Sequence, residues 1–171
     1  MTDRATTLLG GRRERLERLL GRTLAPPPPD ASEPITDEGR KYLMGEAEDL
    51  YWNEIEWEHI TDEEAMEEGP IPEMTFPGLL AFVRGLLLSE VMPDSLSPAE
   101  PRPQVVVDLL GFLAKRVVEL EEALAEPSTE AVRLQAELTM TSGLIDRVLY
   151  AFHGLGGEDI ERVEAEAGAS A

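Results

Sequence analysis

The two residues best placed to do chemistry are Glu56 and His59, in the tract Glu56-Trp57-Glu58-His59. Residues three apart lie on one face of a helix, and a carboxylate and an imidazole at this spacing bind metal ions in helical bundles. Such centres need the pair twice, with further inward glutamates, and His153 has Tyr150 rather than an acid three residues before it. A metal-dependent helical-bundle enzyme using Glu56 and His59 is therefore one alternative, and a solvated acidic face is favoured.

Other catalytic arrangements have few candidate residues. The chain has 171 residues with no cysteine and two histidines, so the usual nucleophile and base combinations lack members. With 35 acidic residues, some carboxylate pair is inevitable and carries no specificity. The run Gly154-Leu155-Gly156-Gly157 follows an expected helix rather than a strand, which indicates a helix end and not a phosphate loop. We expect no catalytic residue, no cofactor and a protein that is not an enzyme.

The net charge of −20 is distributed unevenly. Residues 37–77 contain fourteen acidic and two basic residues, whereas residues 1–24 contain six arginines and three acids. A strongly acidic surface repels nucleic acid and anionic lipid and attracts basic proteins. We therefore expect no direct binding to nucleic acid. An acidic regulator or nucleic-acid mimic that binds a basic protein surface is a second alternative.

Three aromatic residues, Tyr51, Trp52 and Trp57, fall within seven positions of this acidic segment and include both tryptophans. Tryptophan and tyrosine are enriched among the residues that dominate protein interfaces. One interpretation makes them anchors for a basic partner. The other is that they cover the apolar helix that follows, and the sequence favours neither.

A short basic amphipathic helix is predicted over residues 12–24, with leucines on one face and arginines around them. A helix of this length is marginal alone, so it must dock against something. Four prolines at positions 26–29 form a semi-rigid spacer, which favours docking to another chain over this chain's own acidic segment. The candidate docking residues are Leu16, Leu19, Leu20, Arg12, Arg15 and Arg18.

Capping residues and prolines divide the next part of the chain. Thr36 predicts a helix over about residues 37–59, and Thr61 predicts a short helix that ends near Gly69. Apolar and acidic residues alternate over 51–60, so a strand there is the minority interpretation. Thr75 predicts a helix over about 76–91 that is apolar on most sides and belongs in the centre of a bundle.

The clearest pattern is a heptad repeat on two successive segments. Apolar residues recur every three or four positions over 103–126 and again over 131–152, after Pro127 and a possible cap at Ser128. The short turn predicts an antiparallel hairpin. The first series comprises Val106, Leu110, Leu113, Val117, Leu120 and Leu124, and the second Ala131, Leu134, Leu138, Thr141, Ile145, Val148 and Phe152.

These patterns predict an all-α fold: a bundle of about four helices with an antiparallel heptad hairpin and a tethered N-terminal amphipathic helix. The expected parts are a basic docking helix over 1–24, a proline-rich linker over 25–35, an acidic bundle over 36–153, and an acidic tail over 154–171 with a short helix at 158–167. The apolar stretch at 79–92 is interrupted by charge and is too short to span a membrane.

The absence of cysteine and of a signal-peptide pattern favours a cytoplasmic protein, and the excess of arginine over lysine is typical of a GC-rich, here expected bacterial, genome. The leading functional hypothesis is a non-enzymatic protein–protein interaction module, an adaptor or accessory subunit of a larger assembly. It would bind a protein partner through the basic arm and the acidic aromatic segment. A homo-oligomer is compatible with the same patterns.

Overall fold

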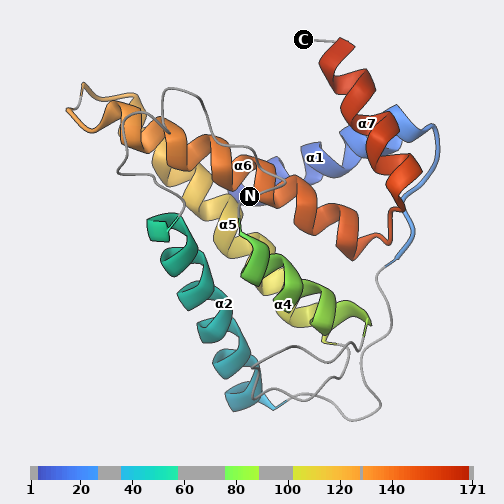
Figure 1. The fold of residues 1–171 in the computed structure, drawn as a ribbon, viewed down its shortest axis with the longest axis horizontal. Coiled ribbons are helices and arrows are strands. Elements are labelled where there is room, and N and C mark those ends of the chain that lie inside the picture. Colours follow the sequence, from blue (N-terminus) through green and yellow to red (C-terminus); the bar gives the residue numbers. More distant parts are fainter. Residues whose placement is uncertain (1–3, 27–35, 58–75, 89–101, 128, 170–171) are drawn as a thin grey trace.

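The computed structural model describes residues 4–26, 36–57, 76–88, 102–127 and 129–169, and the regular structure in these ranges is entirely helical (Figure 1). This confirms the predicted all-α class. The helices are α1 (Arg4–Leu20), α2 (Asp37–Trp57), α4 (Pro77–Leu88), α5 (Pro103–Leu124), α6 (Ala131–Phe152) and α7 (Gly157–Ala169).

Helices α5 and α6 lie side by side and form the centre of the fold (Figure 1). Most of the predicted heptad residues are buried, including Leu113 on α5 and Ile145 on α6. Ala131 is exposed and Leu134 only half-buried, because they lie at the turn end of the hairpin. Residues outside the heptad series, such as Leu109 and Leu144, are also fully buried, so each helix packs on more than one side.

Helix α2 begins as predicted, because the Thr36 hydroxyl accepts a hydrogen bond from the Gly39 amide at 3.0 Å. The helix continues to Trp57, so the strand interpretation is wrong over residues 51–57. The spacing of apolar residues at every fourth position favours a helix more strongly than the alternation of apolar and acidic residues favours a strand. Leu43, Ala47, Tyr51 and Ile55 are all buried on one face of the helix. Residues 58–60 and the predicted short helix over 61–69 lie outside the described residues.

Helix α4 is apolar and buried, as its composition predicts, and packs against α2, α5 and α6. It begins at Pro77, with the Phe76 carbonyl accepting from the Leu80 amide at 2.9 Å. The predicted cap, Thr75, and the predicted end at Val91 lie outside the described residues. Among the described residues, α2 supplies acceptors for the first turn, where Glu54 accepts hydrogen bonds from the Gly78 and Leu79 amides. An acid at a helix N-terminus is favourable.

Helix α1 spans Arg4–Leu20, whereas the sequence predicts residues 12–24. It starts earlier because Gly10 and Gly11 do not interrupt it, and it ends earlier because Gly21 adopts a φ of 68°. The helix packs against α5 and α7 of the same chain. The structure therefore shows α1 docked within the chain, on α5 and α7 rather than on the acidic segment, and docking to another chain stays a prediction.

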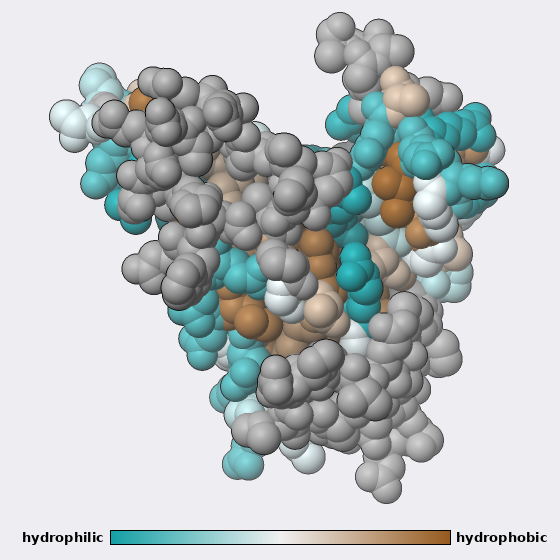
Figure 2. Space-filling view, viewed as in Figure 1, coloured by the Kyte–Doolittle hydropathy of each residue, from teal (hydrophilic) through white to brown (hydrophobic). Residues whose placement is uncertain are grey.

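Helix α7 spans Gly157–Ala169, slightly longer than the predicted 158–167. Val163 is buried, and the helix packs on α1. One hydrophobic cluster contains buried residues from all six described helices. In the space-filling view, hydrophobic residues are visible next to hydrophilic ones on the described part of this face (Figure 2). In the described part of the chain, no helix is long and apolar enough to cross a membrane.

Candidate functional site

The most distinctive surface residue is Trp52, a large aromatic side chain that is 44% exposed. Its ring makes edge contacts with Tyr51, at 4.9 Å between centroids, and with Phe112 of α5, at 6.5 Å. The Arg116 guanidinium lies over the ring, 5.1 Å from its centroid. Cation–π and edge contacts of this kind fix the orientation of an indole that solvent can still reach.

Tyr51 lies directly beneath this surface and is fully buried. Its hydroxyl donates to Glu137 Oε2 at 2.8 Å and lies 2.7 Å from the Thr141 hydroxyl, and its ring stacks on Phe76. Burial raises the pKa of Tyr51 far above its ordinary value, so the hydroxyl remains a donor. Tyr51 is a core residue here and is not accessible as an interface anchor. It fits the alternative in which the aromatics cover the next helix.

An ion pair between α5 and α6 connects the buried tyrosine to the exposed tryptophan. The Arg116 guanidinium donates from Nε to Glu137 Oε2 at 2.5 Å and from Nη2 to Oε1 at 2.9 Å. The Glu137 side chain is 7% exposed and the Arg116 side chain 22%. Hydrogen bonding to Glu137 raises the pKa of Arg116 above its already high value, so its charge is permanent. Glu137 thus positions the cation that supports Trp52.

Neither Arg116 nor Glu137 was among the residues predicted from the sequence. One local signal was available, because Phe112 and Arg116 are four residues apart and so share a face of α5. Glu137 on α6 meets Arg116 only at one alignment of α5 against α6. The sequence of either helix alone does not determine that alignment.

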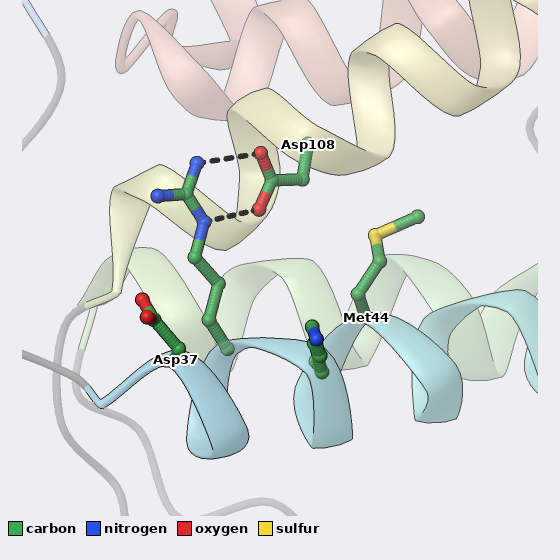
Figure 3. Close-up of a pocket in the computed structure, with 5 residues that line it drawn as sticks. Asp37, Met44 and Asp108 are labelled. Carbon is green, nitrogen blue, oxygen red and sulfur yellow. Dashed lines mark hydrogen bonds and ion pairs between the residues drawn. The ribbon is translucent and has the colours of Figure 1, made fainter.

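A cleft of about 320 Å³ lies between α2 and α5, near the start of α2 (Figure 3). Arg40 crosses it and donates to Asp108 from Nε at 2.5 Å and from Nη2 at 2.7 Å. Its other lining residues are Asp37, Lys41 and Met44. Met44 is eight residues before Trp52, about 12 Å along the helix. The lining combines four charged side chains with one thioether, so it offers ionic contacts.

The predicted docking residues of α1 divide into two groups. Leu16 and Leu20 are each 4% exposed and Leu19 is half-buried, so the leucine face is used within the chain. Arg12 is also engaged internally, because it donates to the backbone carbonyl and the hydroxyl of Ser142 and binds Asp146 at 2.8 Å. Arg15 and Arg18 are exposed. In this arrangement only the two exposed arginines remain accessible to a partner.

The two residues of the metal-site alternative, Glu56 and His59, lie at the end of α2 and beyond it. The backbone of Glu56 belongs to α2, but its side chain, the side chain of Trp57 and all of His59 lie outside the described residues. Within the described ranges, no group of three or more histidine, aspartate and glutamate side chains could hold a metal ion.

No family model, curated protein or solved structure matches this chain. The surface chemistry of the chain is therefore what bears on its function. In the described residues, that surface combines the oriented, exposed Trp52 with the acidic helix α2.

Proposed function

We propose that this chain is a non-enzymatic protein-interaction module, an adaptor or accessory subunit, that binds a basic partner through its Trp52 face. The Trp52 face comprises Trp52, the acids Glu48 and Asp49 one turn before it, and Phe112 and Arg116 of α5. The observation that carries the proposal is the exposed indole held by Arg116 and two aromatic edges.

A pre-oriented tryptophan is well suited to binding for a thermodynamic reason. Ordering a mobile side chain at an interface costs about 0.5–1.5 kcal/mol. The contacts of Trp52 with Tyr51, Phe112 and Arg116 reduce this cost before a partner arrives. An aromatic side chain held in this way resembles the anchors that dominate measured interface energies.

The charge of α2 supports a basic partner. The helix contains seven acidic and two basic residues, and one of the two, Arg40, is paired with Asp108. A surface with this excess of negative charge accelerates encounter with cationic proteins and disfavours acidic ones. Glu48 and Asp49 lie one turn from Trp52, where they would face cationic side chains around the anchor.

The test compares partner binding by the intact chain, by Trp52→Ala and by the control Val132→Ala. Val132 is the matched control because it is also a large exposed hydrophobic residue, 62% exposed, but lies on α6. Partners captured from cell extract by the intact chain should be retained by the control and lost by Trp52→Ala. Calorimetry with the purified partner should then show a loss of about 2 kcal/mol or more, near thirtyfold in Kd, as for an interface anchor.

Salt and charge variants test the basic character of the partner. Affinity should fall as ionic strength rises, because screening shortens the range of the attraction to about 3 Å at 1 M salt. Glu48→Gln combined with Asp49→Asn should weaken binding and reduce its salt dependence. Capture that is unchanged by Trp52→Ala, or affinity that is independent of salt, would contradict the proposal.

A further inference from the structure

His153 is a buried histidine at the end of α6 with one hydrogen bond and one unpartnered nitrogen. The residue is 8% exposed, and its Nδ1 lies 2.7 Å from the carbonyl oxygen of Ala25. Because a carbonyl oxygen only accepts, Nδ1 carries the hydrogen. Nε2 is buried and has no partner in the described part of the chain. The arrangement therefore suits a neutral imidazole, with the lone pair at Nε2.

Ala25 lies where the chain leaves α1 toward the proline-rich segment. Two hydrogen bonds fix Leu24 and Ala25 in this position. The Glu17 carboxylate accepts from the Leu24 amide at 3.0 Å, and His153 donates to the Ala25 carbonyl. Arg12 on α1 is further held by Ser142 and Asp146 on α6. His153 thus belongs to the set of contacts that dock α1 onto the rest of the bundle.

The environment of His153 disfavours a second proton. Burial lowers the pKa of His153 below its ordinary value and Arg13 lowers it further, while the Ala25 carbonyl and Glu17 oppose these effects. The Phe152 ring meets the imidazole edge-on at 5.1 Å and offers no acceptor oxygen. Protonation would create a buried N–H without an acceptor.

Three ion pairs join α1, α6 and α7 near this end of the fold. Arg12 binds Asp146, Arg22 binds Asp159, and Arg147 binds Glu164. These pairs leave Arg13 and Glu17 as the charged groups that act on the imidazole.

We propose that His153 is a pH-sensitive switch that stabilises the docking of α1 and residues 21–26 on the bundle when neutral and weakens this docking when protonated. The released state exposes the leucine face of α1 and the basic arginines around it. Released α1 is then the amphipathic helix that the sequence predicts as a docking element.

The direction of the pH dependence follows from proton linkage. The docked state binds the proton more weakly than the released state, in which the imidazole is solvated. Docking is therefore independent of pH above the ordinary histidine pKa of about 6.5 and weakens as the pH falls below it. The docking constant falls by at most about tenfold per pH unit, down to the lower pKa of the docked histidine.

Hydrogen exchange of the full chain at pH 7.5 and pH 5.5, corrected for intrinsic rates, tests the switch. This window lies above the ordinary pKa of carboxylates, about 4, so histidine is the side chain that changes charge. In the native chain, protection of α1 amides should fall several-fold, up to about tenfold, while protection of α5 stays constant. His153→Asn keeps a donor for Ala25 without a titrating group, so its α1 protection should not change with pH.

Imidazole NMR provides a readout that does not depend on a variant. The chain contains two histidines, and His153→Asn identifies their signals. His153 should titrate below the ordinary value. The proposal is overturned if α1 protection in the native chain is equal at both pH values, if His153→Asn shows the same loss, or if His153 titrates at or above the ordinary value.

Discussion

The Arg116–Glu137 pair is expected to respond asymmetrically to the loss of each partner. Arg116→Met leaves the Glu137 carboxylate, whose side chain is 7% exposed, with the Tyr51 hydroxyl still donating to it. An uncompensated charge buried to this degree costs about 3–5 kcal/mol of folding free energy. Loss of the cation over Trp52 adds about 0.5–1 kcal/mol.

Glu137→Leu should cost less, about 1–3 kcal/mol, because the groups it leaves behind find other partners. The Arg116 side chain is 22% exposed and also lies 3.3 Å from Glu119, so the guanidinium keeps water and a second carboxylate. The Tyr51 hydroxyl keeps its contact with Thr141. The double variant removes both charges and should be less destabilised than Arg116→Met alone.

Urea unfolding followed by circular dichroism measures these differences, with Lys115→Met as the control. Lys115 is exposed on the same helix, so its replacement should change stability by no more than about 0.5 kcal/mol. If Glu137→Leu is as costly as Arg116→Met, or if the two effects add in the double variant, the pair is not a coupled buried interaction and the reasoning is refuted.

Three further predictions concern local features of the fold. Gly78→Ala should destabilise the protein by about 0.5–1 kcal/mol, because its Cβ would lie 2.9 Å from the Glu54 oxygen that caps α4 and would displace it, whereas Gly111→Ala meets nothing within 4 Å and should stabilise by about 0.5–1 kcal/mol; thermal unfolding of the two variants should shift in opposite directions. Gly154→Ala should lower stability by about 1–2 kcal/mol in urea unfolding, because φ there is 65°, and a Gly156→Ala control with open space around it should not. Burial raises the pKa of Tyr150 to about 12, so stability should decline as the pH rises from about 10 toward 12, and Tyr150→Phe should reduce that decline; an equal decline in the variant would contradict the assignment.

Much of the helical framework could be predicted because it is encoded in local periodicity. The heptad series gave the positions of α5 and α6, and the apolar stretch after Phe76 gave the buried character of α4. The burial of Tyr51 could also have been predicted from the helical spacing of Leu43, Ala47, Tyr51 and Ile55. The clustering of aromatic residues suggested, as one of two interpretations, an exposed position.

Contacts between distant segments could not be predicted in the same way. Arg116 meets Glu137 only at one register of the hairpin, and Glu54 reaches the start of α4 only because α2 and α4 pack together. The docking of α1 against α5 and α7 likewise depends on the path of the chain between helices. The four prolines predict a stiff segment, but they do not predict the position of α1 relative to the other helices.

The single guanidinium of Arg116 has a consequence for any protein that binds at Trp52. It contacts the exposed indole on one side and the buried carboxylate on the other. Partner binding at Trp52 and the stability of the folded chain are therefore thermodynamically linked. A partner that prefers the oriented indole must raise the melting temperature of the chain, and a substitution that loosens the interior must weaken that partner without touching it.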